Sequence, residues 1–170
     1  LLLSWSDDDN FGCDNVLVTE GLVKDQWQHV ATVYDQGTWT IFVDGTAVAS
    51  ATGSESAGQG KGSKLSIGGL YALPEKSPLG GSMAQLRITH SAVYDATFEP
   101  EFPLSKSTDT ALLYDFEEGS GQVLSDSGPE SNDGAISGAS WRKFKSPDLG
   151  GVDLVCKLAE ESTDADGDDI

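Results

Sequence analysis

The chain has 170 residues, of which 38% are hydrophobic, and its formal net charge is −18. A charge of this sign argues against a nucleic-acid-binding protein, because phosphates would be repelled and no lysine and arginine stripe offers counterion release. It also argues against binding to an anionic membrane surface, and no apolar run approaches the roughly 20 residues of a membrane helix. Twenty glycines and the rarity of helical apolar periodicity favour an all-β protein with little helix.

The first predicted elements are two short strands, residues 1–6 and 16–23, which flank an acidic loop. A β-hairpin is then predicted for the stretch that begins at Trp27, WQHVATVYDQGTWTIFVDG. Its side chains alternate along two β-branched and aromatic runs that a turn sequence, DQG, separates. Asp44 and Gly45 close the second strand, since glycine readily takes the positive φ of a tight turn. We expect Trp27 and His29 to be packed core residues.

Loops and shorter strands are predicted for the rest of the chain. Glycine, serine and proline mark loops at 53–62 and 73–81, both of which are candidates for a binding edge. A strand at 83–88 should lie centrally in its sheet. Further alternating strands are predicted at 112–116, 123–124 and 135–136.

Four ordered stretches resemble the laminin G-like (concanavalin A-like) jelly-roll domains. They are W-x-H-V-A-x-x-Y-D followed by V-D-G, then LSIGG at 65–69, GSMAQLRITHSAVYDATF at 81–98 and ALLYDFEEGSGQVLSDSGPESNDGAISGASW at 111–141. The resemblance implies an antiparallel β-sandwich over residues 1–145, followed by an extension and acidic linker over 146–170. It also implies that Tyr94 and Phe98 anchor the exit loop against the sheet. It departs from the family at Ala84 and Gln85, where acidic residues are common.

The order of these stretches is unusual, because residues 111–141 resemble the part that commonly opens such a domain. The segment could complete the same sandwich, begin a second and truncated domain, or insert into a neighbouring subunit. We favour the first alternative, since an isolated pair of strands is marginally stable without a sheet to join. Insertion into a neighbour would be strand addition and could build a fibre.

No constellation of residues predicts catalysis. Retaining glycoside hydrolases need two carboxylates about 5 to 5.5 Å apart, and the usual strand pattern E-x-D-x-x-E is missing from the sequence. Glu117 and Glu118 are adjacent and would point to opposite faces of a strand. There is no G-x-S-x-G nucleophile turn either. We therefore predict a protein that is not an enzyme.

Calcium is the cofactor that the sequence best supports, since carboxylate, amide and loop carbonyl oxygens are its preferred ligands. Asp126, Asn132 and Asp133 lie in DSGPESNDG, which resembles a loop of the family and could collect such oxygens. The alternative is that these residues only form turns. Two other acidic stretches, DDDN near the start and DADGDD at the end, are further candidates.

Two aromatic residues are candidates for glycan binding. Trp5 and Tyr71 lie at or next to predicted loops, where an exposed ring could stack on a sugar beside polar side chains. The alternative is that each ring packs in the core.

The two cysteines, Cys13 and Cys156, lie far apart in the sequence. In a secreted domain they could form a disulfide, which on the loop-entropy model would contribute about 4 to 5 kcal/mol. The ends of a jelly roll often meet, so we favour this bridge. Two buried free thiols are the alternative.

The chain lacks an initiator methionine and opens inside a predicted strand, so we expect a segment or processed piece of a larger protein. We predict a non-catalytic extracellular or cell-surface binding and adhesion module. Its rim loops would recognise a glycan or an extracellular protein, with possible assistance from calcium. The alternative is a structural subunit of an extracellular polymer that assembles by strand exchange or lateral packing.

Overall fold

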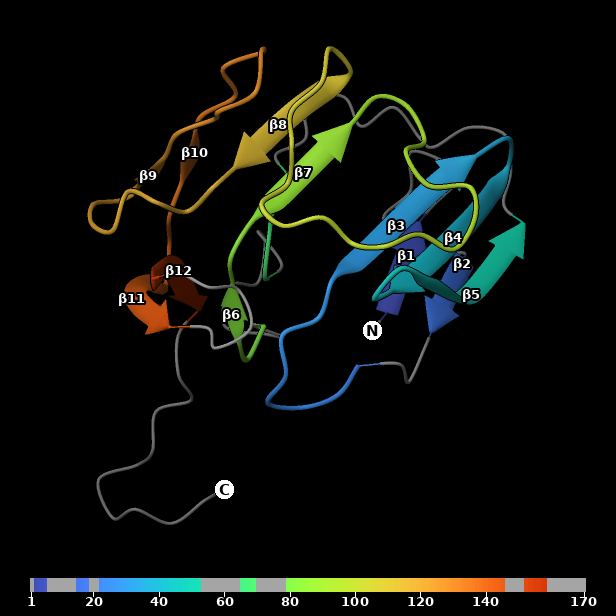
Figure 1. The fold of residues 1–170 in the computed structure, drawn as a ribbon, viewed down its shortest axis with the longest axis horizontal. Helices are drawn as coiled ribbons and strands as arrows, with labels where there is room; N and C mark the ends of the chain where they lie inside the picture. The colour runs from blue at the N-terminus through green and yellow to red at the C-terminus, as the bar shows by residue number, and fades with distance from the viewer. Residues whose placement is uncertain are drawn as a thin grey trace. The chain divides into compact units, whose positions relative to one another are not determined.

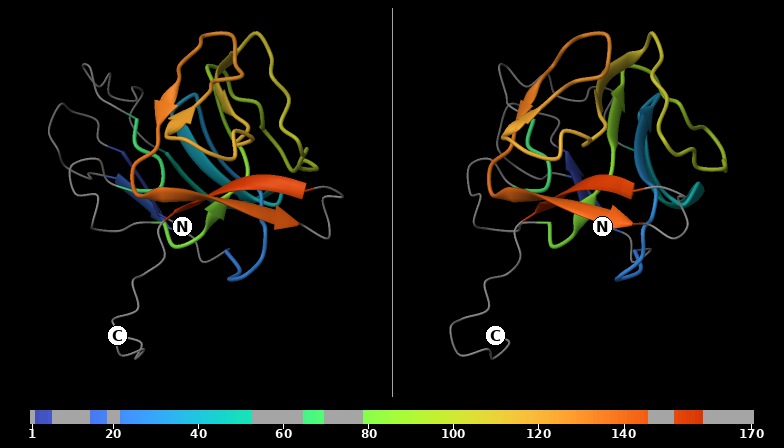
Figure 2. Two further views of the ribbon diagram at one scale, coloured as in Figure 1. Left: turned by 90° about the vertical axis from the view of Figure 1, so that its left-hand side faces the viewer. Right: turned by 60° about the vertical axis from the view of Figure 1, so that its left-hand side comes forward.

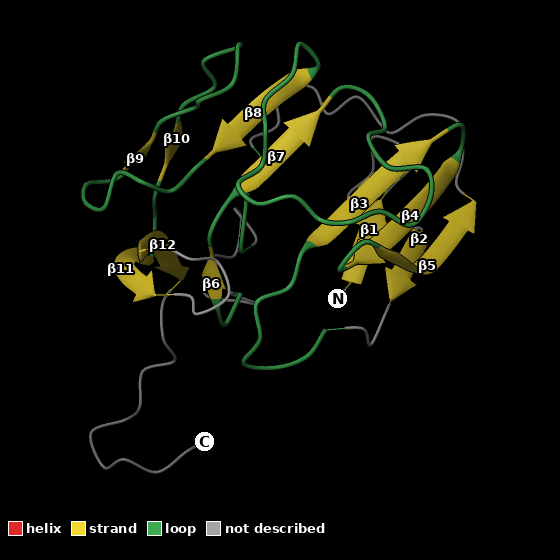
Figure 3. Ribbon diagram, in the orientation of Figure 1, coloured by secondary structure: helices red, strands yellow, loops and turns green. Residues whose placement is uncertain are grey.

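A computed structural model describes residues 2–5, 15–18, 22–52, 65–69, 79–145 and 152–158, with side chains described for 22–52, 65–69 and 79–143. These residues contain twelve strands, all in antiparallel pairings, and no helix (Figures 1 and 3). The predicted all-β fold class is confirmed. Within the same ranges, no helix is long and apolar enough to span a membrane.

The chain forms two compact units. Unit 1 comprises residues 1–63 and 91–101, and unit 2 comprises residues 64–90 and 102–170. The strands of unit 1 are β1 (Leu2–Trp5), β2 (Asn15–Val18), β3 (Val30–Asp35), β4 (Thr38–Val43) and β5 (Thr46–Thr52). Those of unit 2 are β6 (Ser82–Met83), β7 (Leu86–Thr89), β8 (Thr110–Tyr114), β9 (Val123–Leu124), β10 (Gly134–Ala135), β11 (Ala139–Lys145) and β12 (Val152–Leu158).

In unit 1, β3, β4 and β5 form a three-stranded meander and β1 pairs with β2 (Figure 1). Both turns of the meander have two central residues at positive φ, Gln36 (45°) with Gly37 (82°) and Asp44 (47°) with Gly45 (76°). This backbone is that of type I′ turns, whose twist matches the flanking strands. The predicted hairpin and both of its turns are therefore confirmed.

The central strand β4 carries the buried hydrophobic residues of the described part of unit 1. Ile41, Phe42 and Val43 are 0%, 3% and 6% exposed, because neighbouring strands flank β4 on both sides. Trp27, in contrast, is 38% exposed, so our expectation that it lies in the core is wrong. It precedes the first residue pair of the sheet, Val30 with Val43, and therefore has no neighbouring strand of that sheet to cover it.

The segment 91–101 packs on this sheet, as we predicted for Tyr94 and Phe98. Their rings stack at 3.6 Å between centroids, and each contacts the rings of His29 and Phe42. The amide of Phe98 donates to the carbonyl of Gly45 at 3.0 Å. A Cβ at residue 45 would overlap the Phe98 carbonyl oxygen, so the glycine serves the close approach as well as the turn. His29 is a packed residue, as expected.

In unit 2, β7 pairs with β8, β9 pairs with β10, and β12 lies between β11 and β6. Figure 2 shows β11 and β12 side by side, in orange and red. The buried cluster consists of Leu112, Tyr114, Phe116 and Leu124. Phe116 is only 3% exposed although its φ is 54°, a conformation that is rare for a bulky side chain.

The strand predicted at 83–88 is interrupted at Ala84 and Gln85, which separate β6 from β7. The Gln85 side chain accepts a hydrogen bond from the amide of Leu104 at 2.6 Å and donates to Asp115 Oδ1 at 2.8 Å. Among the described strands β7 pairs only with β8. The prediction of one central strand here is therefore wrong.

The segment 111–141 contributes most of β8, all of β9 and β10 and the start of β11. Its first strand pairs with β7 of the same chain, with Leu86 opposite Tyr114. Whether the segment completes the predicted sandwich in cis or inserts into a neighbour stays a prediction. The domain boundaries at 145 and 146 stay a prediction, and β12 from the predicted extension pairs with both β11 and β6.

Candidate functional site

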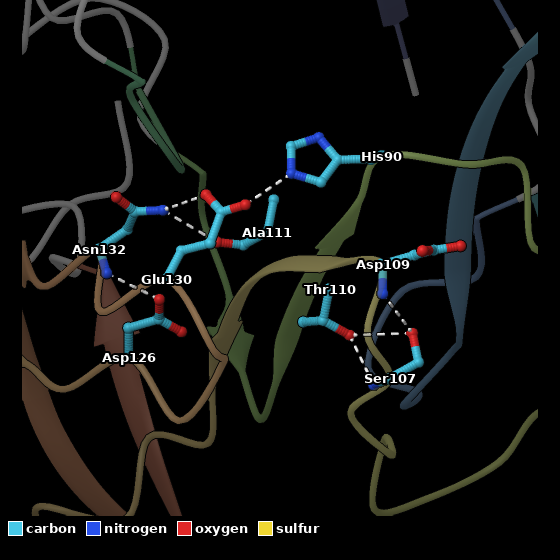
Figure 4. A network of polar contacts seen from close by, with 8 residues as sticks. All are labelled: His90, Ser107, Asp109, Thr110, Ala111, Asp126, Glu130 and Asn132. Carbon is cyan, nitrogen blue, oxygen red and sulfur yellow. Dashed lines mark hydrogen bonds and ion pairs between the residues drawn. The ribbon is translucent and has the colours of Figure 1, made fainter.

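The predicted calcium-binding residues lie in the loop that joins β9 to β10, residues 125–133, which we call the Asp126 loop. The carboxylate of Asp126 accepts three backbone hydrogen bonds (Figure 4 shows the one from Asn132). Oδ1 accepts from the amides of Leu113 at 2.8 Å and Gly128 at 2.7 Å, and Oδ2 accepts from Asn132 at 2.7 Å. Asp126 therefore fastens its own loop to strand β8.

These amides decide the ionisation of Asp126. Burial alone would raise the pKa of its carboxyl, but the amides of Leu113, Asn132 and Gly128 outweigh burial and hold the pKa below its usual value. Hydrogen bonds from amides favour the charged form because they place positive dipole ends against the carboxylate. Asp126 is thus a structural anion near neutral pH.

Asn132 and Asp133 complete the loop. The Asn132 side chain donates to the carbonyl of Ala111 at 2.9 Å, and its own backbone carbonyl accepts from the Tyr114 hydroxyl at 2.8 Å. Asp133 Oδ1 accepts from the Asp126 amide at 2.9 Å. Burial raises the pKa of Tyr114, and the Asp126 and Asp133 carboxylates raise it further, so the hydroxyl remains a donor. The loop is ordered by many contacts of defined geometry.

A histidine and a glutamate that the sequence did not single out join this network. His90 Nε2 lies 2.7 Å from Glu130 Oε1, and Asn132 donates to Glu130 Oε2 at 3.2 Å (Figure 4). Hydrogen bonds from His90 and then Asn132 lower the pKa of Glu130. The His90 and Glu130 side chains are 63% and 45% exposed, and exposed pairs contribute little to stability. Glu130 is therefore held by His90 and Asn132 while its side chain remains partly exposed at the surface of the loop.

The start of β8 is held by a second group of contacts. Thr110, which is fully buried, accepts the Ser107 amide at 2.8 Å through its hydroxyl (Figure 4). The Asp109 amide donates to the Ser107 hydroxyl at 3.3 Å, and the carbonyl of Asp109 accepts the His90 amide at 2.9 Å. These bonds fix the end of β7 beside the start of β8, next to the Asp126 loop.

The structure brings together the three residues predicted to hold calcium, Asp126, Asn132 and Asp133. Both Asp126 oxygens, however, accept amide hydrogens, whose positive dipole ends would repel a cation at the same positions. Among the residues that the structure describes, no three Asp, Glu, His or Cys side chains gather to hold a metal. The geometry fits the turn-forming alternative better, and calcium binding stays a prediction.

A second polar group lies in unit 1 beside β3. Asp44 Oδ1 accepts the His29 amide at 2.8 Å, and Asp44 Oδ2 accepts the Gln28 side-chain amide at 3.1 Å. The Gln28 side-chain oxygen accepts the Val23 amide at 2.6 Å. These contacts fix the segment before β3, on which Leu22, Val23 and Trp27 are exposed.

The other predicted site residues are placed only in part. Trp5 is the last residue of β1, and Cys156 lies in β12 opposite Trp141 and Met83, but the side chains of Trp5 and Cys156 are outside the described part. Tyr71 and Cys13 lie outside the described residues altogether. Glycan binding by Trp5 and Tyr71 and the disulfide between Cys13 and Cys156 remain predictions.

Sequence reasoning missed His90, Glu130 and Gln85, each of which contacts a residue that is distant in the sequence. The contacts of His90 and Gln85 span 40 and 30 residues, and no local pattern encodes such a separation. A weak signal did exist for Gln85, because it stands where the family is often acidic. Where a partly buried residue departs from the family pattern, its side chain can have a hydrogen-bond partner elsewhere in the chain.

Comparison with known proteins supplies the family. A laminin G family model, described as the concanavalin A-like lectin/glucanases superfamily, matches residues 2–97, which is more than half of the 170 residues. No curated protein and no solved structure matches the chain. The matched residues include the first two of the four stretches in which we found the resemblance and all but the last residue of the third, at 81–98. The fourth, at 111–141, lies beyond them. With its antiparallel all-β fold, the chain belongs to the laminin G-like members of the concanavalin A-like lectin/glucanases superfamily, whose fold is a β-sandwich.

Proposed function

We propose that this protein is a non-catalytic extracellular module that binds a glycan or a protein through loops at the rim of its sheets. The observation that carries the proposal is the family match over residues 2–97. Laminin G-like domains are generally non-catalytic binding modules for carbohydrates or proteins and are typically extracellular.

The order of the Asp126 loop supports the proposal. A loop that is fixed before its ligand arrives loses less conformational entropy on binding. Asp126 is partly buried and accepts the Leu113 amide of β8, whereas Glu130 and Asp133 are exposed. The exposed carboxylates could accept hydrogen bonds from sugar hydroxyls or pair with cationic side chains of a protein.

The two glutamates considered for catalysis support a binding module in a further way. Glu117 is exposed, while Glu118 Oε1 accepts the Ser125 amide at 2.7 Å. Glu118 therefore fixes the entry of the Asp126 loop. One exposed and one structurally engaged carboxylate do not make the facing pair that glycoside hydrolysis requires.

Charge restricts the class of ligand. Among the described side chains of unit 2, which carries the Asp126 loop, seven acidic residues outnumber four basic ones. The acidic residues are Asp109, Asp115, Glu117, Glu118, Asp126, Glu130 and Asp133, and the basic ones are Arg87, Lys106, Arg142 and Lys143. The whole chain carries −18. A sulfated or otherwise anionic glycan would be repelled at moderate ionic strength. The proposal therefore favours a neutral or amino-bearing glycan, or a protein surface with positive charge.

A glycan array that contains neutral, amino-bearing and sulfated sugars tests the proposal, and it should be read with calcium and with a chelator. We expect binding to neutral or amino-bearing sugars that Glu130→Ala weakens and that Glu99→Ala, a substitution in unit 1, leaves unchanged. Loss of binding in chelator that added calcium restores would support the calcium prediction. Binding to sulfated sugars alone would contradict the restriction to neutral or amino-bearing glycans.

The alternative predicted from the sequence is a self-assembling structural subunit, and segment 111–141 is its main motivation. Static light scattering of the isolated chain is the direct test. A dispersed monomer at all concentrations would contradict assembly, whereas growth in mass with concentration would favour it over the binding module.

A further inference from the structure

We draw no further inference here: the strongest candidate, the exposed apolar surface that Leu22, Val23 and Trp27 form on the segment before β3, carries nothing because no feature of the described residues shows what covers it.

Discussion

The Asp44 turn of unit 1 and the Asp126 loop of unit 2 both use an aspartate to organise the backbone. Asp44 accepts one main-chain amide, that of His29, and one side-chain amide. Asp126 accepts three main-chain amides, those of Leu113, Gly128 and Asn132. The turn relies mainly on its backbone conformation and on the close approach of Gly45 to the Phe98 carbonyl. The loop relies on the negative charge of Asp126, to which three amides donate.

This difference explains why the two regions should fail in different ways. The turn contains a glycine that no other residue can replace without strain, because its φ is 76° and the Phe98 carbonyl lies against it. The loop, in contrast, is fastened to β8 through one carboxylate, that of Asp126. Steric substitutions should therefore break the turn, and substitutions that remove charge should break the loop.

The largest effect is expected for Gly45→Ala. The new Cβ would overlap the Phe98 carbonyl oxygen and force the segment 91–101 away from the sheet, in addition to the cost of positive φ. We expect a loss of about 3 to 5 kcal/mol in the free energy of unfolding. Denaturant unfolding followed by tryptophan fluorescence measures it.

Gly138→Ala is the matched control, because Gly138 has the same φ of 76° but no atom within 4 Å of a Cβ built there. This variant should lower the free energy of unfolding only by the cost of the left-handed backbone conformation, about 1 to 2 kcal/mol. Equal losses in the two variants would mean that contact with Phe98 contributes nothing. The close approach would then be no part of the stability of unit 1.

The same contrast explains how much the sequence could predict. The hairpin from Trp27 onward could be predicted because its strands, its turns and its Asp44-Gly45 signal are neighbours in the chain, and local sterics fix such turns. The anchoring by Tyr94 and Phe98 could be predicted from the family resemblance. The exposure of Trp27 could not, because side-chain alternation does not show where the pairing of a strand begins.

The candidate site could be predicted only as a set of residues. DSGPESNDG identified Asp126, Asn132 and Asp133, but oxygen-rich loops form turns and metal sites from the same residue types. A turn and a metal site differ in where the side-chain oxygens point, toward backbone amides or toward a shared cation position. That direction depends on the amide of Leu113, 13 residues away, and on strand pairing that only the folded chain brings about.

The second prediction concerns Asp126→Asn. The substitution replaces one acceptor oxygen by a donor that faces backbone amides and removes the charge that those amides stabilise. We expect a loss of about 2 to 3 kcal/mol in the free energy of unfolding, since hydrogen bonds to charged groups are the stronger ones. Chemical denaturation measures the loss.

Asp133→Asn provides the comparison for that variant, because Asp133 Oδ1 accepts the single amide of Asp126. One hydrogen bond at an exposed carboxylate should contribute about 1 kcal/mol or less. If Asp133→Asn costs as much as Asp126→Asn, the three amides are not what makes Asp126 important. The difference between turn and loop would then have another cause.

The third prediction is a dependence on pH. Because the pKa of Asp126 is lower in the folded protein than its ordinary value of 3.8, its contribution to stability is present above that value. It is lost as the pH falls through the lowered pKa. The stability difference between the parent protein and Asp126→Asn should therefore be constant near neutral pH and shrink in strong acid. Unfolding free energies measured from pH 7 downward would show this, and a difference that grows in acid would contradict it.

Apart from the control variants, the smallest effect is expected for Gln85→Glu. Gln85 is a neutral side chain that, like Asp126, accepts a backbone amide hydrogen bond. Gln85 accepts the Leu104 amide and donates to Asp115, so Gln85→Glu keeps the acceptor but turns the donor into an oxygen that faces a carboxylate. We expect a loss of about 1 to 2 kcal/mol in the free energy of unfolding at neutral pH, from the missing hydrogen bond and the repulsion of two like charges.

Adding Asp115→Asn in the same chain should recover most of that loss, because the new side-chain amide can donate to the new carboxylate at position 85. A double-mutant cycle measures the coupling between the two positions. Additive losses would show that the contact between Gln85 and Asp115 does not stabilise unit 2, and that the amide of Leu104 alone gives Gln85 its role.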